Sequence, residues 1–177
     1  MKISNFTPEG SRGFQIFGGF TLVELLVVIS IISLLASVGA GAFLTSQIKG
    51  RDSRRKQDLG QVAKALELYY NDYNRYPGAL GTKIAGCPST TPAACDWGED
   101  EFTDGNTTYM KTIPADPTPS YEYRYEVNST GQKFRIYTRI ENPQDSTIVS
   151  GITKTCGTGN NCNFGVASSN SNLTEGY

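Results

Sequence analysis

The feature that most constrains this chain is a run of apolar residues near its N-terminus that contains a single acid, Glu24. No other residue between Phe20 and Leu44 carries a formal charge. As an α-helix, a segment of this length rises about 37 Å, which is enough to cross a bilayer. A carboxylate inside such a segment costs about 2.5–3.5 kcal/mol on insertion scales, so it is expected to have a partner and a function.

Glu24 also discriminates between the kinds of apolar segment that the sequence allows. An ordinary single-span anchor is the simplest alternative, and a secretory signal fits less well because its apolar core is shorter and holds no acid. If the chain were cut after Gly19, Phe20 would carry a free α-amine and Glu24 would become the fifth residue. The carboxylate could then neutralise its own amine or that of a neighbouring copy, and removal of either charge would leave the other unpaired.

The composition excludes several function classes. The chain has 16 basic and 17 acidic residues, and this near balance argues against nucleic acid as the main partner. It has no histidine, which removes the commonest general base and the commonest metal ligand. There is no Gly-rich phosphate loop either. The sequence therefore predicts a protein that is not an enzyme and uses no cofactor.

All cysteines follow the apolar segment and fall in two close pairs, Cys87 with Cys95 and Cys156 with Cys162. An even number of cysteines in a small exported domain indicates two disulfides and an oxidising compartment. A zinc site is less favoured, because zinc ligands usually lie closer together in sequence. Of the three possible pairings, we predict the local one because it closes the shortest loops.

A helical pattern continues beyond the apolar segment. Apolar residues recur at intervals of three and four, and Pro77 follows the pattern. The residues of this stripe are Leu59, Val62, Leu66, Tyr69 and Tyr73. We predict one helix from Phe20 to about Arg75, apolar all round in residues 20–44 and amphipathic in residues 45–75. The amphipathic half must pack against something, most simply a small sheet.

The start of the amphipathic half is basic. Its cations are Lys49, Arg51, Arg54, Arg55 and Lys56, against Asp52 and Asp58. We interpret this cluster as a solvated helix face. The alternatives are contacts with anionic lipid headgroups before assembly or with a neighbouring subunit after it.

Residues 76–177 are expected to form a globular β head. Alternating aromatic and β-branched residues predict strands over 121–127 and 133–140, joined by a turn at 128–131. A third strand is predicted over 147–155 and a fourth over 163–167. The predicted fold class is α+β, with a long N-terminal helix packed on a small antiparallel sheet.

The segment Gly18-Gly19-Phe20-Thr21-Leu22-Val23-Glu24, followed by the apolar run, resembles the class III signal of type IV pilins and type II secretion pseudopilins. The resemblance implies that a prepilin peptidase cuts between Gly19 and Phe20 and that the new Phe20 amine is N-methylated. It also implies a salt bridge between Glu24 and the Phe20 amine of a neighbour. The chain then divides into a cytosolic leader (1–19), a membrane and filament-core helix (20–44), its amphipathic continuation (45–75) and the head (76–177).

A second motif points to the same family. Ile113-Pro114-Ala115-Asp116-Pro117, followed by Tyr121-Glu122-Tyr123, is similar to the Leu-Pro-x-Asp-Pro…Tyr-x-Tyr signal of major pseudopilins and related small pilins. Many major pseudopilins then carry a calcium-binding loop of aspartates. The corresponding loop here offers mainly Asn142, Gln144 and Asp145, which are too few carboxylates, so no metal is expected.

The resemblance implies a structural filament subunit whose main partner is another copy of itself. Its other partners would be the prepilin peptidase, an inner-membrane platform protein, an assembly ATPase and, before assembly, the membrane. The precursor would cross the inner membrane once with its head outside, and would then enter an extracellular pilus or a periplasmic pseudopilus. The head composition slightly favours a surface pilin. A secretion pseudopilin, a minor pilin and a membrane-anchored binding domain are the alternatives.

Overall fold

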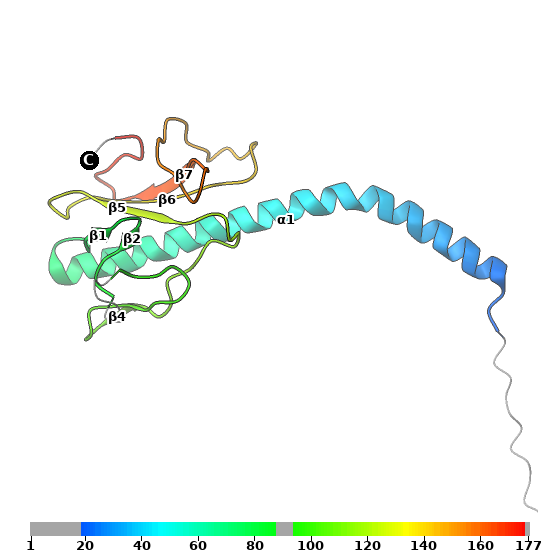
Figure 1. Cartoon of the computed structure of the whole chain (residues 1–177), viewed down its shortest axis with the longest axis horizontal. Helices are drawn as coiled ribbons and strands as arrows, with labels where there is room; N and C mark the ends of the chain where they lie inside the picture. Colours follow the sequence, from blue (N-terminus) through cyan, green and yellow to red (C-terminus); the bar gives the residue numbers. More distant parts are fainter. Residues whose placement is uncertain (1–18, 88–93, 176–177) are drawn as a thin grey trace, which may run out of the picture. The chain divides into compact units, whose positions relative to one another are not determined.

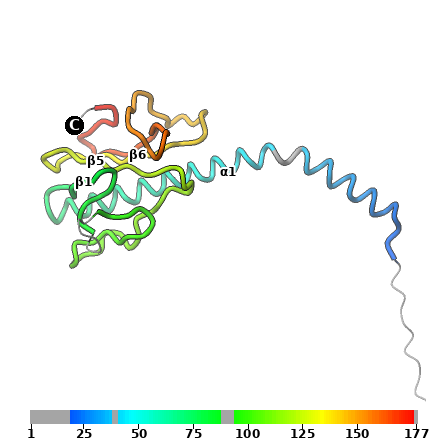
Figure 2. Tube along the Cα trace, in the orientation of Figure 1, coloured from blue at the N-terminus to red at the C-terminus, as the bar shows by residue number. Residues whose placement is uncertain are grey.

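The structure, a computed structural model, describes residues 19–87 and 94–175 (Figure 1). It divides into two units, residues 1–42 and 43–177, which we describe separately. The predicted leader lies outside the described residues except for Gly19. One helix, α1 (Leu22–Tyr73), makes up most of the described part of the first unit and is the first element of the second (Figure 2).

In the first unit, α1 has no protein packed against it. Every described side chain between Gly19 and Ser37 is exposed. By length and composition alone, no single helix among the described residues qualifies as a membrane span, whereas the helical stretches Leu22–Ser37 and Gly41–Tyr73 qualify together.

In the second unit, α1 ends where the backbone turns left-handed. Asn74 has a φ of 51° and donates its N–H to the Tyr70 carbonyl oxygen at 2.7 Å. Asparagine tolerates this conformation better than most residues, so it ends helices in the way that glycine does. Pro77 then prevents a restart.

The main sheet has three antiparallel strands in the order β5 (Arg124–Val127), β6 (Phe134–Thr138) and β7 (Phe164–Ala167). The register places Ile136 between Tyr125 and Val166. Three of the four predicted strands are therefore confirmed, with β5 and β6 shorter than expected. Together with α1 they confirm the α+β class.

The predicted strand over 147–155 is wrong. These residues form turns and contribute only an isolated bridge from Thr155 to Asn161. Asp145 Oδ1 accepts the Thr147 N–H at 2.9 Å, and Gly151 has a φ of 90°, so the backbone cannot stay extended.

Two short hairpins that the sequence pattern did not predict complete the head. They pair β1 (Ala79–Leu80) with β2 (Lys83–Ile84), and β3 (Phe102–Thr103) with β4 (Thr108–Met110). The β3–β4 hairpin packs on α1 through Tyr69, whose ring centroid lies 5.6 Å from that of Phe102 and 5.3 Å from that of Tyr109.

The core lies between the apolar stripe of α1 and one face of the main sheet. Its fully buried members include Leu59, Leu66, Tyr123, Tyr125, Phe134 and Ile136. The other face of β6 is buried as well. There Tyr137 packs with Ile152 and Leu173 in a second cluster that includes both cysteines of the C-terminal disulfide. β6 is thus covered on both faces.

The four cysteines form two local disulfides, Cys87–Cys95 and Cys156–Cys162. In each pair the Cα atoms are 5.1 Å apart, a separation typical of disulfides. All four residues are buried.

Candidate functional site

The first candidate site is the start of α1, next to the Gly19–Phe20 peptide bond. Thr21 and Glu24 cap the helix reciprocally. The Thr21 N–H donates to Glu24 Oε2 at 2.8 Å and the Thr21 hydroxyl donates to the same oxygen at 2.7 Å, while the Glu24 N–H donates to Thr21 Oγ1 at 3.3 Å. This is a capping box, which satisfies N–H groups that would otherwise have no partner. Its Thr-x-x-Glu signal is readable in the sequence, but our sequence analysis missed it.

The cap turns the Glu24 carboxylate back toward the start of the helix. The helix N-terminus carries a partial positive charge, which stabilises a carboxylate there. Among the described residues, only Thr21 donates to the carboxylate, and only to Oε2. Oε1 is therefore available to a donor from outside the chain, and Phe20, which would bear the new amine after cleavage, is the residue next to Thr21.

The helix around Glu24 presents apolar side chains on all its faces. Phe20 is 88% exposed and Leu22 is 78% exposed. The run continues with exposed Val23, Leu25, Leu26, Val27, Val28, Ile29, Ile31, Ile32, Leu34 and Leu35. A helix that is apolar all round has to be covered, either by lipid or by other helices.

The second candidate site is a buried ion network centred on Arg55, which has no exposed surface. Its guanidinium binds Asp116 with two parallel hydrogen bonds, from Nε to Oδ2 and from Nη2 to Oδ1, both at 2.8 Å. Nη1 donates to Asp52 Oδ1 at 2.8 Å, and Nη2 lies 2.7 Å from Glu141 Oε1. Asp116 is the acid of the Ile-Pro-Ala-Asp-Pro motif. That motif therefore supplies the main partner of a buried helix cation.

The same network fixes the loop that follows β6. The two carboxylate oxygens of Asp52 accept the N–H groups of Glu141 and Asn142, each at 2.9 Å. Lys56 Nζ donates to both oxygens of Asp145, at 2.9 and 2.7 Å. The first part of this loop is thus bound to α1 by charged groups at two places. Bidentate and charge-assisted hydrogen bonds of this kind are the strong ones.

This network corrects our interpretation of the basic cluster as a solvated helix face. Arg55 is fully buried, and Arg51 and Lys56 are partly buried and paired with Glu141 and Asp145. Only Lys49 and Arg54 stay exposed. The sequence pattern could not show this, because the partners from outside α1 lie 61 to 90 residues further along the chain.

In the loop after β6, Asp145 forms an ion pair within the head. Its carboxylate is occupied by the Lys56 ammonium. Within residues 19–87 and 94–175, no three Cys, Asp or Glu side chains are grouped closely enough to hold a metal ion.

The network should make the head less stable in acid. The hydrogen bond from Arg51, assisted by Arg55, lowers the pKa of Glu141 to about 2 from its ordinary value of 4.5. A lowered pKa means that the stabilisation is complete above about pH 4.5 and is lost as the pH falls toward 2. We expect urea midpoints of the detergent-solubilised chain, followed by fluorescence, to fall over this range. Glu141→Gln should show a shallower pH dependence, and an unchanged pH dependence would contradict the assignment.

Comparison with known proteins identifies a motif and several relatives of this chain. The prokaryotic N-terminal methylation motif matches residues 17–40. The type II secretion system core protein G of Aeromonas hydrophila is 31% identical over 120 residues, which are 64% of this chain and 74% of that protein. Core protein G of Klebsiella pneumoniae is 32% identical over 116 residues, covering 64% of this chain and 76% of that protein.

A third relative matches a shorter part of the chain. The type IV major pilin protein PilA of Myxococcus xanthus strain DK1622 is 30% identical over 76 residues, which are 43% of this chain and 31% of that protein. No solved structure matches.

Proposed function

The chain belongs to the family of type IV pilins and type II secretion pseudopilins and is a pilin-like filament subunit; from this premise we propose how it is processed, how it assembles and which machine it serves. A prepilin peptidase cuts between Gly19 and Phe20, and the Phe20 amine is then methylated. The match of the methylation motif to residues 17–40 supports the position of the cut. The start of α1 at Leu22 also supports it, because the Gly19–Phe20 bond then lies outside the helix.

Before assembly, α1 holds the subunit in the inner membrane with the leader in the cytosol and the head outside. The two disulfides support this orientation, since they form and persist in oxidising compartments. A platform protein and an assembly ATPase then move subunits from the membrane into the fibre. The exposed apolar side chains of α1 contact lipid before this step and the helices of neighbouring subunits after it.

The observation that supports the assembly proposal is the hydrogen bonding of the Glu24 carboxylate. Its carboxylate points to the helix start and has Oε1 free of bonds from the described chain. In the fibre this oxygen accepts the Phe20 amine of a neighbouring subunit. The pair fixes the register between subunits, because a buried charge without its partner is strongly destabilising.

Of the possible machines, we favour a type II secretion pseudopilus. The core protein G relatives align over about two thirds of this chain, which must include part of the head, whereas the pilin PilA aligns over less than half. A surface type IV pilus is the second candidate, and the Thr- and Asn-rich head with two disulfides favours it. Deletion of the gene separates them: exported proteins accumulate in the periplasm in the first case, and surface fibres disappear in the second.

Gly19→Ala tests the processing step. We expect uncut precursor to accumulate and no fibres to form, because Gly19 is the residue of the signal that directly precedes the proposed cut. Gly18→Ala is the matched control and should be processed. The measurement is the intact mass of the membrane-extracted chain. A mature species of Gly19→Ala that still begins at Phe20 would refute the assigned cut.

A further inference from the structure

The outer face of α1 in the head carries positive charge that the head itself does not neutralise. Lys49, Ser53, Gln57 and Lys64 are exposed and share this face at helical spacing, with Arg54 beside them. Within the described residues Lys49 and Lys64 form no ion pair, and the only ion-pair partner of Arg54 is Asp58 at 3.8 Å. The exposed acid Glu67, about one turn beyond Lys64, ends the run of positive charge on this face. Lys49 and Lys64 are about 22 Å apart along the helix. We call this face the basic face.

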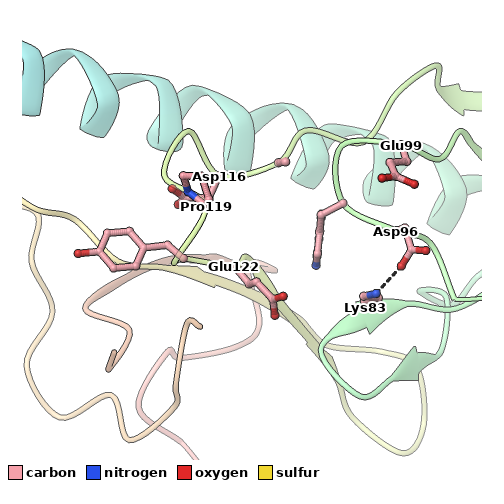
Figure 3. A pocket seen from close by; sticks show the side chains of 9 residues that line it. Lys83, Asp96, Glu99, Asp116, Pro119 and Glu122 are labelled. Atoms are coloured by element: carbon pink, nitrogen blue, oxygen red, sulfur yellow. Dashed lines mark hydrogen bonds and ion pairs between the residues drawn. The ribbon is translucent and has the colours of Figure 1, made fainter. Parts of the chain in front are cut away.

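The negative charge of the head gathers elsewhere. Residues 96–104, which we call the acidic loop, hold Asp96, Glu99, Asp100, Glu101 and Asp104 and no lysine or arginine. The loop borders a surface hollow of about 300 Å³, which Glu122 also lines (Figure 3). Of the acids that line the hollow, Asp96 pairs with Lys83, and Asp116 pairs with the buried Arg55 behind it. Glu99 and Glu122 are exposed and have no cationic partner among the described residues.

We propose that the basic face of one subunit docks on the acidic loop and hollow of a second copy of this chain. The proposal rests on the proposed filament function and names the head surfaces that meet in the fibre. Two complementary patches at different places on one molecule make a head-to-tail contact. Repetition of such a contact produces an open helical polymer rather than a closed dimer. The basic face and the apolar segment belong to the same helix, α1.

Opposite charges on the two surfaces would make this contact specific. Exposed ion pairs add little affinity individually, but they select partners and fix register, and like charges placed together are repelled. The stem of one lysine of the basic face can lie against Trp97 and Tyr121 in the hollow while its ammonium group reaches Glu122. The other lysine, about 22 Å away along the helix, then lies outside the hollow.

Charge reversal on the full-length chain tests the proposal. K49E/K64E and E99K/E122K should each reduce fibre yield about tenfold, because each brings like charges together at every subunit contact. The variant with all four changes should recover wild-type yield, since every contact again joins opposite charges. K49R/K64R keeps the charge and serves as the matched control. Fibres are quantified by shearing and electron microscopy, and folding is checked by urea unfolding.

The outcomes separate this inference from the proposed function. If both reversed variants form fibres at wild-type yield, or if the fourfold variant stays as defective as its parents, the docking surfaces are wrong. If wild type fails to form fibres with its assembly machinery present, the filament function itself fails. Recovery in the fourfold variant alone supports the docking of these two surfaces.

Discussion

Glu24→Ala is expected to be cleaved normally after Gly19 and to form no fibres. The substitution leaves the Phe20 amine of a neighbour without a partner inside an apolar filament core. Loss of one member of a buried ion pair costs about 3–5 kcal/mol, which corresponds to a reduction of at least about a hundredfold in assembly. The measurements are the intact mass of the membrane-extracted subunit and the amount of sheared fibre.

The capping box offers a competing explanation for the same loss, and a second variant separates the two. Glu24→Gln keeps an acceptor for the Thr21 N–H, because glutamine serves at this position of a capping box, but it removes the charge. We expect Glu24→Gln to fail like Glu24→Ala. Thr21→Val keeps the charge and removes the hydroxyl of the cap, so it should still assemble. Fibres from Glu24→Gln at wild-type yield would show that Glu24 acts only as a helix cap and not as the partner of an amine.

The second large effect is expected for Arg55→Met. The substitution removes the one cation that binds Asp52, Asp116 and Glu141 together and leaves their carboxylates in a nearly dry site. Breaking a buried ion pair from one side costs about 3–5 kcal/mol, a large part of the 5–15 kcal/mol by which domains are usually stable. We expect a marked fall in the urea midpoint of the full-length chain, followed by the fluorescence of Trp97.

Arg54→Met is the matched control on the same helix. Its side chain is 63% exposed and lies 3.8 Å from Asp58, so its loss should cost less than about 1 kcal/mol. Equal midpoints for Arg54→Met and Arg55→Met would show that the Arg55 network does not hold the head together.

Local patterns in the sequence predicted most of the fold. The stripe from Leu59 to Tyr73 identified the buried face of α1, and alternation identified β5 and β6. These patterns work because helix and strand each bury one face at a fixed period. The 147–155 segment has strand-like composition, but its hydrogen bonds go to Asp145 and to a loop rather than to a strand.

Of the two candidate sites, the sequence predicted the first and not the second. The Gly-Phe-Thr-Leu-Val-Glu motif is local, so Gly19, Phe20 and Glu24 could be chosen from the sequence as the residues of processing and assembly. The Arg55 network could not, because its members come from α1, the Asp116 motif and the loop after β6. A run of helix cations looks the same in sequence whether solvent or carboxylates surround it. Only the fold brings Asp116 and Glu141 to Arg55.

The most direct test of the account is a cryo-electron microscopy map of fibres assembled from this chain. We predict subunits that begin at Phe20, with the Glu24 carboxylate within about 4 Å of the Phe20 amine of a neighbouring subunit, the usual limit for an ion pair. Subunits that retain residues before Phe20, or Glu24 bound only to Thr21 of its own chain, would contradict the claim that cleavage creates the partner of Glu24.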